Sequence, residues 1–135
     1  MTTQRTTVMT TMPDRILAAC VQLTSGADVA KNLEVCARLC REARGRGAQL
    51  VVLPENFAFM GLHEADKFQV AEAVGDGTIS TALRSMATDN QLWVVAGGMP
   101  ERSSEPGKVY NTLVAIAPDG HTVAHIGFSP TAVRS

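Results

Sequence analysis

The chain has 135 residues, which suits one compact domain or part of a larger one, because folding at this size hides roughly two thirds of the unfolded surface. It is 45% hydrophobic and 19% charged with a formal net charge of -1, so it has no general attraction to nucleic acid or to an anionic membrane. No apolar run reaches the ~20 residues of a membrane span, and the start lacks a secretory signal, so we expect a soluble cytoplasmic protein.

The first 15 residues are rich in threonine and include Arg5, Asp14 and Arg15. Two interpretations are open for this segment. We favour a disordered terminus, and the alternative is a weak organellar transit leader, because such leaders are rich in hydroxyl residues and arginine and poor in acids.

A strand, a helix and a second strand are predicted next. Ile16–Leu23 is apolar and ends at a Thr-Ser-Gly turn, which predicts a buried strand. Asp28 is a suitable N-cap for a helix that ends near Gly45. One face of that helix carries an apolar stripe, formed by Val29, Leu33, Cys36, Cys40 and Ala43.

The second strand is Leu50–Leu53, a continuous apolar run that predicts burial on both faces, and Pro54 closes it. The two strands should be parallel, since a helix connects them, and the predicted fold class is therefore α/β.

The following segment, Asn56–Asp76, is predicted to be a loop on the functional side of the sheet, with a short helical piece around Ala65–Ala73. A second helix carries Ile79, Ala82, Leu83 and Met86 and ends near Asp89. The four apolar residues of this second helix lie on one face, as those of the first helix do.

Strands dominate the remainder. We predict a strand at Leu92–Ala96, a turn at Gly97-Gly98 and another at Ser103–Gly107. A hairpin should follow, with Val109–Ala117 and His121–Ile126 as its strands and Pro118-Asp119-Gly120 as its turn. The strand pattern breaks at Gly127, so residues 16–126 form the predicted domain and residues 127–135 a divergent tail.

The three cysteines, Cys20, Cys36 and Cys40, are interpreted as buried free thiols, since an odd number without a secretion signal argues against a disulfide framework. The alternative is a nucleophile or a metal-binding pair. No histidine or acid lies at ligand spacing from them, and we expect neither a metal nor a cofactor.

Glu55 is the main candidate for chemistry. It follows a predicted buried strand by two residues, which places its carboxylate at the carboxyl edge of the sheet, where α/β proteins form ligand crevices. Partial desolvation there would favour its protonated form and make it a usable general base. The alternative is a solvated acid in a loop.

Several segments in order resemble the nitrilase superfamily of carbon-nitrogen hydrolases, from Ile16 to about His125. The segments are Ile16–Gln22, the helix with Asn32, Leu50–Glu55, Trp93–Gly98, Val109–Thr112 and Pro118–Gly120. Each is short, but their order and spacing make the resemblance specific. Among subgroups, the chain is most similar to amidases of deaminated glutathione and to omega-amidases.

The resemblance implies a four-layer αββα sandwich, of which this chain would form the N-terminal part. It also implies a small amide substrate and a glutamate, lysine and cysteine that act together, with Glu55 at the glutamate position. In that chemistry the cysteine attacks the amide carbon, the glutamate transfers protons and the lysine stabilises the oxyanion.

The lysine and the cysteine of that pattern are not found in this chain. The family's Tyr-Arg-Lys segment falls at Ile126, Gly127 and Phe128, and no cysteine here stands in a Cys-Tyr-Asp context. Lys108 is interpreted as a solvated loop residue rather than a substitute.

Other polar residues are interpreted as structural. His63, His121 and His125 are scattered, with no acid at a spacing typical of a triad or a metal site. Asn111, beside Tyr110, is expected to have a cross-strand role, although its match to the family makes substrate contact an alternative.

Two hypotheses about function follow. In the first, the chain is a truncated amidase that is inactive alone. In the second, it is a binding module that associates with a full-length relative or with another copy, because a sheet meant to be covered later would expose apolar surface. A generic α/β ligand-binding domain is a third, weaker interpretation, since no glycine-rich phosphate loop is present.

Overall fold

The computed structural model describes residues 14–132, so the N-terminal leader expected over residues 1–15 lies outside the described residues except for Asp14 and Arg15. The elements in chain order are β1 (Ala18–Cys20), α1 (Val29–Gly45), β2 (Leu50–Leu53), a 3-10 turn (Glu64–Asp66), α2 (Lys67–Val70), α3 (Thr78–Asn90), β3 (Trp93–Arg102), β4 (Lys108–Ile116) and β5 (Thr122–Ala132). No helix within this part of the chain is long and apolar enough to cross a membrane.

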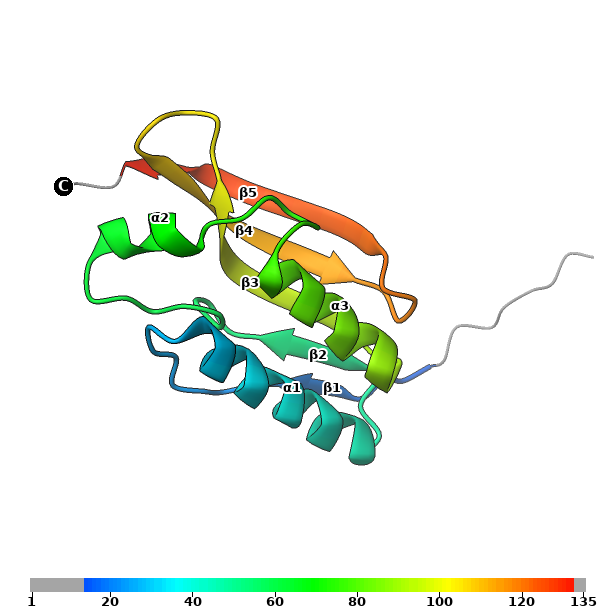
Figure 1. Cartoon of the computed structure of the whole chain (residues 1–135). Helices are drawn as coiled ribbons and strands as arrows, with labels where there is room; N and C mark the ends of the chain where they lie inside the picture. Colours follow the sequence, from blue (N-terminus) through cyan, green and yellow to red (C-terminus); the bar gives the residue numbers. More distant parts are fainter. Residues whose placement is uncertain (1–13, 133–135) are drawn as a thin grey trace, which may run out of the picture.

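The strands form one mixed sheet in the order β1-β2-β3-β4-β5. β1 pairs with β2 and β2 with β3 in parallel, whereas β3 pairs with β4 and β4 with β5 in antiparallel fashion. Figure 1 shows α1 and α3 lying across the same face of this sheet. The predicted α/β class, the parallel strand-helix-strand unit and the final hairpin are confirmed.

The first helix forms for the local reasons that its sequence indicates. The Asp28 side chain accepts a hydrogen bond of 3.0 Å from the backbone N–H of Lys31, and the helix ends at Gly45 as predicted. Its apolar stripe packs on the sheet. The core between helices and sheet includes Leu33, Cys36, Cys40, Leu83 and Met86 from the helices and Val51, Leu53, Val94, Ala96, Val114 and Ile116 from the strands.

Within residues 14–132 the opposite face of the sheet carries no helix, and we call it the open face (Figure 1). Strand pairing places on it Ala18, Cys20, Leu50, Val52, Trp93, Val95, Asn111, Leu113, Ala115, Ala124, Ile126 and Phe128. Trp93 is 45% exposed, and Ile126 and Phe128 are each 59% exposed. The sheet and its helices therefore make two layers, with one apolar sheet face uncovered.

The open face explains two corrections. β2 is buried on one face only, because Val51 and Leu53 face the helices whereas Leu50 and Val52 are half-buried on the open face. β1 is shorter than Ile16–Leu23 and is not buried, since it forms an edge of the sheet. Cys20 is accordingly exposed rather than buried.

Gly97 and Gly98 do not form the predicted turn. They lie inside β3, where the register with β4 shifts between Ala96 and Met99, and the strand continues to Arg102. Gly98 has a φ of +51°. This is a β-bulge, in which β3 has one residue more than the facing part of β4 and the strand still continues. Glycine allows it because a residue without a Cβ adopts a positive φ at little cost.

β5 also continues beyond its predicted end. Gly127 pairs with Thr112 and Ala132 with Lys108, so the strand break expected at Gly127 is wrong. Pairing along the full length of β4 holds the backbone extended where the side-chain pattern is irregular. The division of the chain at residue 126 stays a prediction, and residues 133–135 of the expected tail lie outside the described residues.

Candidate active site

Glu55 stands two residues beyond the end of β2, at the carboxyl edge of the parallel strands. The next residue, Asn56, has a φ of +57° and turns the chain away from the sheet. Phe57 and Ala58 then enter the core with no exposed surface. The segment that carries Glu55 is therefore fixed by the strand on one side and by buried residues on the other.

Asn32 of α1 connects the segment that follows Glu55 to this helix. Its side-chain nitrogen donates to the carbonyl oxygens of Ala58, at 2.9 Å, and Gly26, at 2.8 Å. Its side-chain oxygen accepts from the Gly26 N–H at 3.0 Å. Asn32 is buried, so these bonds satisfy a polar side chain inside the protein and tie both loops to the helix.

The Glu55 carboxylate contacts Asn111 of β4. The Asn111 side-chain nitrogen donates to Glu55 Oε1 at 3.2 Å, across the intervening strand β3. The lack of a side chain at Gly98 makes room for Asn111, because a Cβ at Gly98 would overlap Asn111 Oδ1. Asn111 thus has more than the expected cross-strand role, and it brings β4 into contact with the candidate base.

A hollow of about 450 Å³ lies beside Glu55 at one end of the open face. It is lined by Val52, Leu53, Glu55, Val95, Gly97, Gly98, Asn111, Leu113 and Phe128. Glu55 itself is exposed, so the partial desolvation expected from the sequence is not present in this chain. The physical reason is that nothing among residues 14–132 covers the open face.

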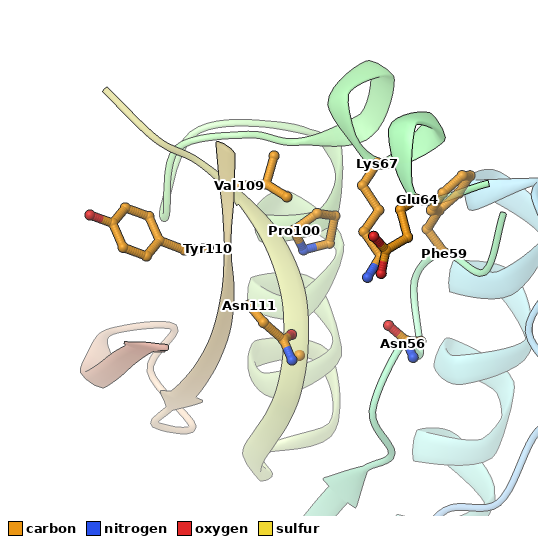
Figure 2. A pocket seen from close by; sticks show the side chains of 9 residues that line it. Asn56, Phe59, Glu64, Lys67, Pro100, Val109, Tyr110 and Asn111 are labelled. Atoms are coloured by element: carbon orange, nitrogen blue, oxygen red, sulfur yellow. The ribbon is translucent and has the colours of Figure 1, made fainter. Parts of the chain in front are cut away.

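A smaller pocket of about 20 Å³ shares Gly98 and Asn111 with this hollow. In Figure 2, Asn56 and Asn111 lie on opposite sides of it, with Lys67 of α2 and Glu64 beside it. Its volume admits about one water molecule. We therefore place the candidate site in the larger hollow that contains Glu55.

The remaining charged candidates do not line the Glu55 hollow. Lys108 is the first residue of β4 rather than a loop residue, and its ammonium pairs with the Glu105 carboxylate at 2.5 Å. His63, His121 and His125 are all exposed. Within residues 14–132, no group of three histidine, cysteine or acidic side chains is placed to hold a metal ion.

The two helical cysteines are suited to packing rather than to nucleophilic attack. Burial raises the pKa of the Cys36 thiol to about 11. Burial and the neighbouring Cys36 raise the pKa of the Cys40 thiol to about 12. Because the thiolate is the reactive form, both side chains are unreactive at neutral pH, as the interpretation of these two residues as buried thiols requires.

The hollow therefore has one carboxylate, that of Glu55, and one amide hydrogen-bonded to it, that of Asn111, but no cysteine and no lysine among its lining residues. Sequence reasoning found the acid and missed the contact with Asn111. The only sequence signal for that contact is the Tyr-Asn-Thr segment, through its resemblance to a segment of the family.

Known proteins resemble the chain over most of its length. Deaminated glutathione amidase of Synechocystis sp. is 42% identical over 109 residues, which are 80% of this chain and 39% of that protein. The human protein of the same name is 35% identical over 111 residues, which are 80% of this chain and 34% of that protein. The chain therefore spans about two fifths or less of the length of these relatives.

Solved structures agree in fold. The C. elegans NitFhit protein superposes with a TM-score of 0.70 at 27% identity, over 82% of this chain and 27% of that chain. An amidase from Nesterenkonia sp. gives a TM-score of 0.70 at 25% identity, over 82% of this chain and 41% of that chain. Residues 17–127 match the carbon-nitrogen hydrolase family, and the protein belongs to that family.

Proposed function

We propose that this chain supplies the glutamate-bearing part of an amidase active site and that the 135-residue chain alone does not hydrolyse amides. Glu55 is the proposed general base, and a small linear amide is the proposed substrate. The observation that carries the proposal is the hydrogen bond between Asn111 and Glu55 at the edge of a hollow open to solvent.

The proposed reaction needs two further groups. A thiol must lose its proton to Glu55 and attack the amide carbon, Glu55 then passes this proton to the leaving nitrogen, and a cation must stabilise the oxyanion. Water, which Glu55 deprotonates, then hydrolyses the thioester and frees the thiol. In the family pattern described above the two further groups are a cysteine and a lysine, and neither lines the hollow. Groups that act as a unit lose nearly all catalysis when one is missing, which supports inactivity of the chain by itself.

An amidase assay with two proteins tests the proposal. The first is this chain alone, and the second is this chain joined to the part of the Synechocystis relative that follows its matched segment. With a small omega-amide substrate, we expect no turnover from the first and ammonia release from the second. Turnover by the chain alone would contradict the proposed inactivity.

The role of Glu55 is tested in the joined protein. Glu55→Gln should abolish turnover, because an amide cannot accept the proton, whereas Glu105→Gln, in the exposed pair with Lys108, should leave it unchanged. If the joined protein works equally well with Glu55→Gln, Glu55 is not the base.

A second candidate function is a non-catalytic module that binds a full-length relative. The observation that favours it is the open face, which exposes Trp93, Ile126 and Phe128. Co-purification of the tagged chain with the Synechocystis relative tests it. Loss of capture on Ile126→Glu is the expected result, and capture that persists in this variant would contradict binding through the open face.

A further inference from the structure

The smaller pocket adjoins the Glu55 hollow, and Lys67 is the only cation among the residues that line either cavity. In Figure 2 the Lys67 side chain extends from α2, and its ammonium points toward the space between Asn56 and Asn111. We propose that Lys67 binds a carboxylate of the substrate, so that the site selects amides with a carboxylate at their other end. This inference rests on the amidase function proposed above and adds to it a residue that determines specificity.

The surroundings of Lys67 differ from those of the two other lysines in the chain. Lys31 is exposed on α1, and Lys108 pairs with the Glu105 carboxylate at 2.5 Å. Lys67 is half-buried, and in the described part of the chain no acid forms an ion pair with it, including the exposed Glu64 of the same pocket. A half-buried ammonium without a partner attracts an anion more strongly than a fully solvated one, because less water screens its charge.

The segment that carries Lys67 is held to the rest of the protein on both sides of α2. After the helix, the Arg102 N–H donates to the Glu72 carbonyl oxygen at 3.0 Å, which ties the chain to β3. Before it, the Met60 N–H donates to the Gly26 carbonyl oxygen at 2.9 Å. The backbone at Lys67 is therefore in place before a ligand arrives, which reduces the entropy lost on binding.

The size and chemistry of the smaller pocket suit one oxygen of a carboxylate. Its volume of about 20 Å³ admits one atom of the size of a water oxygen. Lys67 supplies the opposite charge, and the Asn56 side-chain amide can donate a hydrogen bond. Both cavities include Asn111, whose nitrogen donates to Glu55 Oε1 at 3.2 Å. A linear substrate with its amide carbon beside Glu55 would therefore extend past Asn111 toward Lys67.

This role differs from that of the cation that stabilises the oxyanion. Lys67 lines the smaller pocket and does not line the hollow that contains Glu55. A partner of the oxyanion acts on the reacting carbon of every amide, whereas a partner of the distant carboxylate acts only on substrates that carry this second group. Loss of the first lowers kcat for all substrates, and loss of the second raises KM for the anionic ones.

Initial rates of the joined protein with succinamate and succinamide test the role of Lys67, because these substrates differ in charge but little in shape. Lys67→Met keeps the length of the side chain without its charge. It should raise KM for succinamate at least about tenfold and leave kcat/KM for succinamide unchanged. Lys31→Met is the matched control and should change neither, and Lys67→Arg should keep the preference for succinamate. Equal losses with both substrates, or no loss with either, in Lys67→Met would overturn the assignment.

A binding measurement on the chain alone separates this inference from the amidase function. At constant ionic strength, succinate should shift the Asn56 and Asn111 side-chain amide signals of the ¹⁵N-labelled chain in a saturable way. Lys67→Met should weaken this binding at least about tenfold, and Lys31→Met should not. The absence of saturable binding, or equal affinity in Lys67→Met, would overturn carboxylate binding by Lys67 even if the joined protein is an amidase. Binding that depends on Lys67, with a joined protein that hydrolyses neither amide, would support the carboxylate site and contradict only the amidase function.

Discussion

The side-chain nitrogen of Asn111 donates a hydrogen bond of 3.2 Å to Glu55 Oε1, although the two residues are 56 positions apart in the sequence. The contact joins the end of a parallel strand to the middle of an antiparallel one. It depends on the register of β2, β3 and β4 together, since β3 lies between the two partners.

Glu55→Gln should change the environment of the Asn111 side-chain amide. Removing the carboxylate charge weakens the acceptor, so the Asn111 amide resonances should move in a ¹H–¹⁵N spectrum, after assignment by their loss in Asn111→Asp. Glu105→Gln is the control and should leave them in place. Because the pair is exposed, unfolding free energy should fall by no more than about 1 kcal/mol. Unmoved Asn111 signals in Glu55→Gln would contradict the contact.

Gly98→Ala should destabilise the chain by about 1–3 kcal/mol, measured by urea unfolding. The new Cβ would meet Asn111 Oδ1 and the residue would keep a φ of +51°. Gly107→Ala is matched to it, because Gly107 has a φ of +75° with nothing within 4 Å of an added Cβ. The excess loss in Gly98→Ala measures the collision, and equal losses in the two variants would mean that Asn111 does not occupy this space.

Asn32→Ala should lower the unfolding free energy by about 2–4 kcal/mol, because the variant leaves the buried Ala58 carbonyl and the Gly26 N–H without their Asn32 partner, although the Gly26 carbonyl still accepts from the Met60 N–H. Asn90→Ala is the control. Asn90 makes one bond of 2.8 Å to the Met86 carbonyl at a helix end, and its loss should be smaller. Similar losses in both variants would show that Asn32 does not hold the Glu55 segment.

Local signals were sufficient for much of the fold. The bounds of α1 follow from Asp28 and Gly45, and β2 and the β4–β5 hairpin follow from an apolar run and an Asp-Gly turn. The position of Glu55 at the sheet edge also needed only the end of β2. Its role in chemistry stays a prediction.

Non-local packing determines the structural features that could not be predicted from the sequence. Gly97 and Gly98 have the composition of a turn, but pairing with β4 keeps them in a strand as a bulge. The exposure of Cys20 and Glu55 depends on what covers the open face, which no pattern within the chain specifies. Asn111 reaches Glu55 only because three strands align.

The cysteines give the last prediction. Burial holds the pKa values of Cys36 and Cys40 at about 11 and about 12, above the value of 9.0 for a free thiol. Near pH 8, an aromatic disulfide reagent should therefore modify one thiol of the folded chain, Cys20, and three after unfolding.

As pH rises above 9, the unfolded state loses thiol protons that the folded state retains, so the unfolding free energy should fall progressively until the folded groups ionise. Cys40→Ala, compared with Cys20→Ala, should flatten this decline in urea unfolding between about pH 8 and 11, after correction for its lower starting stability. Rapid modification of all three thiols in the folded chain, or the same alkaline decline in both variants, would contradict burial as the cause.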